Sequence, residues 1–274
     1  MSRFSIIAVF KESIAVPFQN MKGFLGSIGV FIGIYFIIGV SMTLLISDNL
    51  SFTTLMSGDP MAIAESMGGG SPLGLLFFVV FMWFILIPVI AMIFNYWVRH
   101  AAFGPGHGFA PSAGEMIKMG FVNALKFFGV GIVLAIAFML LGLVFGFLFG
   151  MLGLLDLDSM AGLNQENLSA GLIGMQVMMG VGVCFIYAIM SGSLTRTALG
   201  SDYIAIRDPH ANDFAVVLML IYVPVIIVSA FLPFIFGLVA GFLLSMVVSL
   251  WSTFAIASAH GIRHKYCLAL ESQD

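Results

Sequence analysis

Charged side chains are scarce in this sequence. Asp, Glu, Lys and Arg together make up 8% of its 274 residues, whereas 61% are hydrophobic, and the mean hydropathy is +1.14. Soluble globular domains carry about 25% charged residues, so this composition excludes an ordinary soluble domain. The formal net charge of −3 gives no overall basic character, and we expect no nucleic-acid partner. The chain is therefore predicted to lie in a lipid bilayer.

Cysteine is also rare, and recognisable catalytic motifs are missing. The two cysteines, Cys184 and Cys267, are too few for a disulfide framework or for a zinc site of the usual spacing. The sequence contains no His-Glu-x-x-His, no Gly-x-Ser-x-Gly, no phosphate-binding glycine loop and no Cys-x-x-Cys. Ser191 and Ser193 lie in an apolar segment without a His or Lys to activate them. We therefore expect a protein that is not an enzyme and that holds no cofactor or metal.

The long hydrophobic segments predict an all-α polytopic membrane protein with six transmembrane helices. Crossing the hydrocarbon core takes about 20 apolar residues in a helix. The six segments that approach or exceed this length are 24–46, 73–98, 127–155, 172–195, 214–232 and 236–259. None carries an ionisable side chain at its middle, where a transporter or pump usually holds one. We expect the last two segments to form a tight hairpin in which Pro233 ends the first helix, because proline supplies no backbone donor.

Basic residues are missing from two of the connections between these segments. The loops 47–72 and 156–171 contain Asp and Glu but no Lys or Arg, and all ten basic residues lie on the opposite side. Cytoplasmic loops carry the excess of Lys and Arg, so both termini are expected in the cytoplasm and both acidic loops outside. We predict a multi-pass protein of a bacterial inner membrane.

An internal sequence repeat suggests that the six helices form three related hairpins. Shifting the chain by 103 residues aligns 14–39 with 117–142, and seven of 26 positions agree. The predicted units within the single domain 1–274 are 1–106, 107–200 and 201–266, followed by a short tail, 267–274. Each unit begins with a cytoplasmic lead-in and an Asn, at Asn20, Asn123 and Asn212, able to cap a helix. The first lead-in is amphipathic and is interpreted as an interfacial helix ending at Pro17, or alternatively as an extension of the first span.

Glycine is placed at intervals of four residues on three of the predicted spans. Apolar burial gains little inside lipid, so helices there pack through small residues that allow close backbone approach. The candidate packing positions are Gly29, Gly33, Gly142, Gly146, Gly150, Gly237 and Gly241. They are interpreted as contacts among the six helices of one chain, with homo-oligomerisation as the alternative.

The densest polar cluster lies in the predicted second cytoplasmic loop. Its residues Arg207, Asp208, His210 and Asp213 fall within the stretch Arg-Asp-Pro-His-Ala-Asn-Asp. Asp-Pro starts turns and Asn212 can cap the following helix, so the cluster is interpreted as a turn. The alternative is a docking loop for a partner.

Methionine and histidine permit two cofactor hypotheses. Met175, Met178 and Met179 are soft ligands of the kind that suit Cu(I), but methionine also serves as an adaptable packing residue. His100 and His260 are predicted near the cytoplasmic boundary, where they pair with lipid phosphate or, alternatively, ligate a tetrapyrrole. In both cases the interpretation without a cofactor is preferred.

The function expected from these observations is non-enzymatic. The lack of buried charge, catalytic motifs and an extramembrane domain favours an accessory, assembly or scaffold protein that acts through helix packing. Its expected partners are membrane lipids and either another membrane protein or further copies of the same chain. The alternative is a carrier of a lipid or another neutral or amphipathic small molecule, which needs no charge within the membrane.

Overall fold

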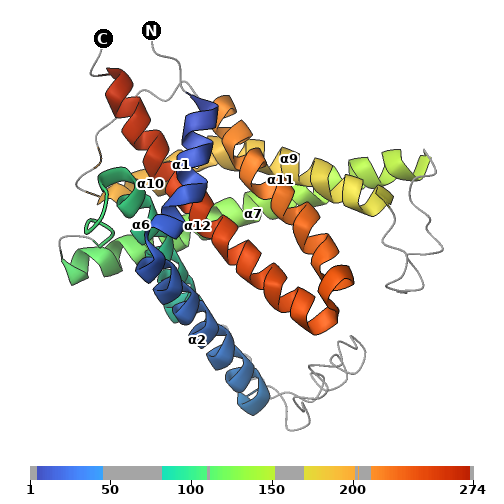
Figure 1. The fold of residues 1–274 in the computed structure, drawn as a ribbon, viewed down its shortest axis with the longest axis horizontal. Coiled ribbons are helices and arrows are strands. Elements are labelled where there is room, and N and C mark those ends of the chain that lie inside the picture. The colour runs from blue at the N-terminus through green and yellow to red at the C-terminus, as the bar shows by residue number, and fades with distance from the viewer. Residues whose placement is uncertain are drawn as a thin grey trace.

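The computed structural model describes residues 5–45, 82–109, 112–151, 170–200, 203 and 211–271. This part of the chain is all-helical, with eight α-helices and one short π-helix (Figure 1). The elements are α1 (Ile6–Gln19), α2 (Met21–Leu45), η1 (Met82–Leu86), α6 (Ile87–Phe103), α7 (Ala113–Met151), α9 (Ala170–Met190), α10 (Gly192–Leu199), α11 (Ala211–Phe236) and α12 (Leu238–Glu271).

Within the described residues, four helical segments are long and apolar enough to cross a membrane, which agrees with a multi-pass membrane protein. They are Phe84–Phe103, Ala113–Leu148, Ala211–Pro233 and Ala240–Ala269. A fifth candidate is the pair Gly174–Met190 and Gly192–Leu199, which is bent by 50°. The first predicted span, 24–46, falls on α2, a helix of 25 residues, in which the apolar stretch Met21–Ile34 is not counted among the four crossings. The all-helical membrane class is confirmed for four or five spans, and the count of six stays a prediction.

Helix α1 is a separate amphipathic helix that packs on the bundle. Its Val9, Ser13 and Val16 are buried, and α1 contacts α12 and α11. Pro17 lies within the last turn of α1, so the expected end at Pro17 is two residues early. Pro17 has no N–H to donate to the carbonyl of Ser13 four residues earlier, and the hydroxyl of Ser13 donates to Val9 O (2.6 Å).

The three asparagines of the predicted units have different structural roles. Asn20 separates α1 from α2, and its Oδ1 accepts a hydrogen bond from the backbone N–H of Gly23 (3.1 Å), as a helix cap does. Asn123 does not cap a helix, because it is buried inside α7, which runs without a break through the second lead-in and span. Asn212 is the second residue of α11. The predicted cap is therefore correct for Asn20 and wrong for Asn123, whose amide bonds to neighbouring helices instead.

The hairpin between α11 and α12 turns at glycine rather than at proline. Pro233 lies inside α11, and the turn is made by Gly237, which has φ +79°. This left-handed conformation is strained for residues with a Cβ, so glycine determines where the helix ends. The expectation that Pro233 ends the helix is wrong. Pro233 cannot donate to the carbonyl of Ser229, and this carbonyl accepts a hydrogen bond from Ser245 Oγ of α12 (3.2 Å) instead.

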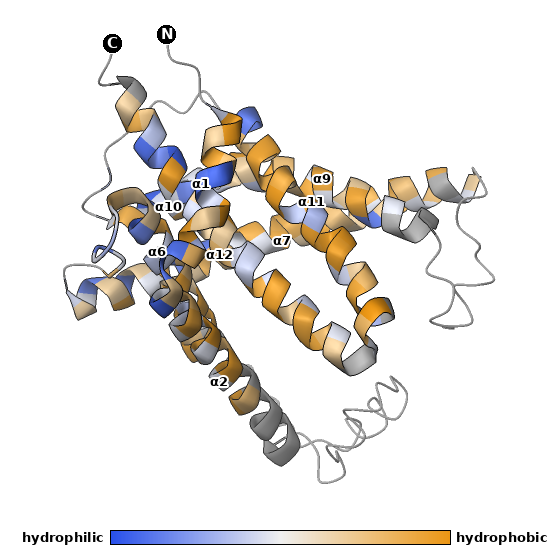
Figure 2. Cartoon of the chain, viewed as in Figure 1, coloured by the Kyte–Doolittle hydropathy of each residue, from blue (hydrophilic) through white to orange (hydrophobic). Residues whose placement is uncertain are grey.

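The packed core is formed mainly by α6, α11 and α12 with neighbouring helices. Trp97 of α6 stacks on Phe254 of α12, with ring centroids 5.3 Å apart, and its indole N–H donates to Ser27 Oγ of α2 (3.1 Å). Hydrophilic residues gather at one end of the bundle, around α10 and the C-terminal part of α12, whereas α7, α9 and α11 are largely apolar over their length (Figure 2). The bundle therefore has one polar end and a broad apolar remainder.

Candidate functional site

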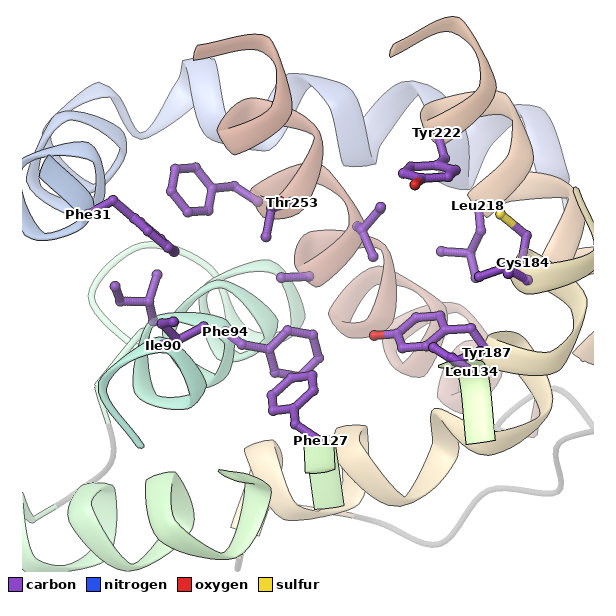
Figure 3. A pocket seen from close by; sticks show the side chains of 15 residues that line it. Phe31, Ile90, Phe94, Phe127, Leu134, Cys184, Tyr187, Leu218, Tyr222 and Thr253 are labelled. Atoms are coloured by element: carbon purple, nitrogen blue, oxygen red, sulfur yellow. The ribbon is translucent and has the colours of Figure 1, made fainter. Parts of the chain in front are cut away.

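A central cavity of about 320 Å³ lies where six helices meet (Figure 3). Helices α2, α6, α7, α9, α11 and α12 each contribute to its wall. The lining residues labelled in Figure 3 are Phe31, Ile90, Phe94, Phe127, Leu134, Cys184, Tyr187, Leu218, Tyr222 and Thr253. Protein interiors are normally packed without large voids, so a cavity of this size is a candidate binding site.

The cavity wall is almost wholly apolar. Aromatic and aliphatic side chains form most of it, and among the described residues that line it none is charged. Its polar groups are the hydroxyls of Tyr187, Tyr222 and Thr253 and the thiol of Cys184. Figure 3 shows the oxygen atoms of Tyr187 and Tyr222 among carbon side chains. This surface suits a mainly hydrocarbon molecule that carries one small polar group.

Tyr187 connects the cavity to a buried histidine. Its hydroxyl oxygen lies 3.2 Å from His260 Nε2, and His260 Nδ1 lies 2.9 Å from Thr195 Oγ1. The imidazole is fully buried among aromatic rings, with the ring centroids of Phe214 and Phe94 at 4.9 and 5.4 Å. The three side chains come from α9, α10 and α12, so the chain of contacts spans the bend between α9 and α10.

The bend at Ser191 is held by side chains from other helices. Side chains of α6 and α7 donate hydrogen bonds to backbone carbonyls of α10, the short helix that follows the bend. Asn123 Nδ2 donates to Leu194 O (3.1 Å), Arg99 Nη1 donates to Leu199 O (2.8 Å), and Lys126 Nζ donates to Ser193 O (2.9 Å). These contacts attach α10 to α6 and α7, and thereby position Thr195 beneath His260.

A second hollow of about 240 Å³ adjoins the central cavity. It is lined by Phe138, Gln176, Gly180, Val183, Tyr222 and Ile226, from α7, α9 and α11. Val183 and Tyr222 line both spaces. These two side chains form the shared wall, and the second hollow extends from it to the amide of Gln176.

The predicted packing glycines fall into two groups. A Cβ on Gly241 would overlap the backbone of Pro233, and one on Gly142 would lie 3.5 Å from Met179 Sδ, so both positions pack within the chain. At Gly29, Gly33, Gly146, Gly150 and Gly237 a Cβ would meet no described atom within 4 Å. The preferred interpretation, packing within the chain, is not seen at these five positions among the described residues, and it stays a prediction together with its alternative, homo-oligomerisation.

The predicted docking loop lies mostly outside the described residues. Arg207, Asp208 and His210 are not described, and Asp213 lies in the first turn of α11. Its interpretation as a turn or as a partner site stays open.

The two cofactor hypotheses receive no support from the site geometry. Met179 is buried beside Gly142, whereas Met178 of the same helix is exposed. The described part of the chain contains no group of three or more His, Cys, Asp and Glu side chains able to hold a metal. Both ring nitrogens of His260 lie within hydrogen-bonding distance of hydroxyls, and His100 stacks on Tyr96.

The sequence interpretation paired His260 with lipid phosphate, and this pairing is wrong. His260 is 0% exposed because α9, α10 and α6 cover it. Tyr187 and Thr195 were not recognised as its partners, since they lie 73 and 65 residues away in the sequence. No local spacing signals a contact of this range. The only hint was a His inside an otherwise apolar helical run.

Comparison of this chain with models of protein families, with curated proteins and with solved structures gave no match.

Proposed function

We propose that this protein is a membrane-embedded carrier that binds a lipid or another neutral or amphipathic small molecule in the central cavity. The observation that supports this function best is the apolar space of about 320 Å³ lined by six helices. Ligand pockets typically have volumes of about 300–1,000 Å³ and are lined mainly by apolar side chains with few polar groups. The cavity matches this description in size and in chemistry.

The lack of charge in the cavity agrees with a neutral cargo. An anionic headgroup buried here would need a cationic partner, since an unpaired charge is very unfavourable in a low dielectric. The described lining residues supply hydroxyls and a thiol instead. A molecule with a hydrocarbon chain and one uncharged polar group would satisfy both parts of the wall.

The neighbouring hollow supports transport rather than permanent storage. It meets the central cavity at Val183 and Tyr222 and reaches the polar side chain of Gln176. The bend between α9 and α10 resembles the discontinuous helices that build binding sites in transporters, where backbone leaves the regular helix only beside a protein-lined space. We propose that cargo moves along α9 between the two spaces.

The carrier is placed in a bacterial inner membrane with six spans, arranged as three related hairpins, and both termini in the cytoplasm. The distribution of all ten basic residues supports this orientation. A salt bridge of 2.9 Å between Lys265 of α12 and Glu12 of α1 agrees with it, because it joins a residue of the first helix to one in the last.

A scaffold function is a second candidate, and the exposed surface of α7 favours it. The C-terminal half of α7 carries exposed apolar side chains such as Leu143 and Phe147, beside the open glycines Gly146 and Gly150. Small residues on an exposed apolar helix are typical of helix-packing surfaces in membranes. Another membrane protein or a second copy of this chain would fit this surface.

Identification of co-purifying molecules tests the carrier function. Wild-type protein is purified in mild detergent, and its extract is analysed by mass spectrometry beside those of Val183→Trp and Val133→Trp. Val183 lines the cavity, whereas Val133 is exposed on α7. We expect a molecule that is retained by Val133→Trp and lost from Val183→Trp. Equal retention by the two variants, or an empty wild-type cavity, would contradict the proposal.

A further inference from the structure

The hydroxyl of Tyr187 is a polar group of the cavity whose hydrogen-bond direction follows from its neighbours. It belongs to a chain of three side chains that ends at a backbone carbonyl. Tyr187 Oη lies 3.2 Å from His260 Nε2, His260 Nδ1 lies 2.9 Å from Thr195 Oγ1, and Thr195 Oγ1 donates to Ser191 O at 3.4 Å. A neutral imidazole has one donor and one acceptor nitrogen, so the protons of this chain must all point one way.

Counting hydrogen bonds identifies the direction in the empty cavity. In one arrangement, Thr195 donates to Ser191 O, His260 Nδ1 donates to Thr195 and Tyr187 donates to His260 Nε2. Every polar hydrogen then has a partner. In the reverse arrangement, Thr195 donates to His260 Nδ1, His260 Nε2 donates to Tyr187, and the hydroxyl hydrogen of Tyr187 points into an apolar space. Buried donors without partners are unfavourable, so the first arrangement is the resting one.

We infer that the cavity selects molecules whose polar group is a hydrogen-bond donor, such as a long-chain or isoprenoid alcohol, and that Tyr187 is the residue that recognises it. In the resting arrangement the hydroxyl of Tyr187 donates its proton to His260 Nε2, and the hydroxyl oxygen of Tyr187 presents its lone pairs to the cavity. A hydroxyl on the bound molecule donates to this oxygen and adds a fourth hydrogen bond. This inference rests on the proposed carrier function and specifies the class of its cargo.

The same three hydrogen-bonded side chains disfavour a bound molecule whose polar group can only accept a hydrogen bond. To donate to an ether or ester oxygen, Tyr187 must take its proton from His260, and the whole chain must reverse. Thr195 then donates to His260 and loses its bond to Ser191 O. The acceptor complex has three hydrogen bonds where the alcohol complex has four. One hydrogen bond corresponds to a preference of about threefold to tenfold.

Binding of farnesol and of farnesyl methyl ether tests this selectivity. The two probes share one hydrocarbon chain and differ in the hydroxyl hydrogen and a methyl group. Each tritium-labelled probe is titrated against the full-length protein in phosphatidylcholine nanodiscs, and the signal is corrected for partition into empty nanodiscs. We expect wild-type protein to bind farnesol about threefold to tenfold more tightly than the ether.

Two conservative variants separate recognition from a structural role. Tyr187→Phe removes the hydroxyl from the cavity, and Thr195→Val removes the partner that sets the direction of His260. Both should bring the ratio of the two affinities close to one, although Thr195→Val leaves every atom of the cavity wall in place. Tyr266→Phe is the matched control, because Tyr266 of α12 is not among the residues that line the cavity and should leave the ratio unchanged. Tyr222→Phe tests whether the other tyrosine hydroxyl of the cavity recognises the probes instead.

The outcomes distinguish this inference from the function on which it rests. If neither probe binds above the level of empty nanodiscs, the carrier proposal fails and the selectivity fails with it. If both probes bind and their ratio is the same in wild type and Tyr187→Phe, the carrier proposal stands and the inference is wrong. A ratio that changes in Tyr222→Phe but not in Tyr187→Phe also overturns it.

Discussion

Gly261 of α12 lies directly against the backbone of α6 at Val98. A Cβ on Gly261 would overlap the carbonyl oxygen of Val98, and the amide nitrogen of Ala102 would be only 2.8 Å away. The backbones of the two helices therefore approach as closely as glycine allows. This contact fixes α12, and with it His260, relative to the helix that carries Phe94 and Trp97.

We predict that Gly261→Ala destabilises the protein. The added methyl group forces α6 and α12 apart, and overpacking of this kind typically costs about 1–3 kcal/mol. Unfolding in mild detergent by added SDS, followed by circular dichroism, measures the change. Gly129→Ala is the control, since a Cβ there meets no described atom within 4 Å. Equal stability of Gly261→Ala and Gly129→Ala would show that the helices do not pack this closely.

Asn95 and Asn123 are predicted to be energetically coupled. Asn123 Nδ2 donates to Asn95 Oδ1 (2.5 Å) and to Leu194 O, and both side chains are fully buried. Asn123→Leu removes both hydrogen bonds and leaves Asn95 Oδ1 buried without this donor, so we expect a loss of about 1–3 kcal/mol. A double-mutant cycle with Asn95→Leu should give a coupling of about 0.6–1.7 kcal/mol, as interhelical hydrogen bonds in membranes do. Strict additivity of the two substitutions would contradict the contact.

Tyr222 is predicted to limit the exchange of cargo between the two hollows. Its ring forms part of the wall that they share. Tyr222→Ala removes most of this wall, so a bound tritiated probe should leave the protein faster than from wild type. Leu220→Ala is the control, because Leu220 is exposed on the same helix. An unchanged release rate in Tyr222→Ala would place the exit elsewhere.

The membrane orientation predicts opposite labelling of two introduced cysteines. In a background where Cys184 and Cys267 are replaced by Ala, Lys265→Cys should react with an impermeant maleimide only from the cytoplasmic side. Asp59→Cys should react only from outside, because its loop contains no basic residue. Lys265 is a suitable site since its side chain is 54% exposed. Reaction of both cysteines from the same side of intact cells would overturn the orientation.

Several features of the fold were readable from the sequence because they depend on local pattern. The apolar runs predicted helices, and four or five of them are long enough to span a membrane. The amphipathic start predicted a separate helix, and α1 has buried Val9 and Val16 on one face with exposed Ile7 on another. Glycine spacing predicted close packing correctly at Gly241, but it gave no special weight to Gly261.

The candidate site depended on contacts that no local pattern contains. His260 could be recognised as a polar residue in an apolar segment, but its burial follows from the packing of helices that are distant in the sequence. The cavity is likewise a property of the assembled helices, because the same Phe and Leu side chains would fill it at slightly different crossing angles.

The sequence by itself determined that this chain is helical, suited to a bilayer and asymmetric in charge, since hydropathy and the placement of Lys and Arg act residue by residue. Only the tertiary structure decided that α9 bends at Ser191, that six helices leave a space between them, and that Tyr187 reaches His260. The physical reason is that these features come from contacts between helices that are far apart in the sequence. How closely their backbones approach and which side chains can hydrogen-bond depend on where each helix lies against the others.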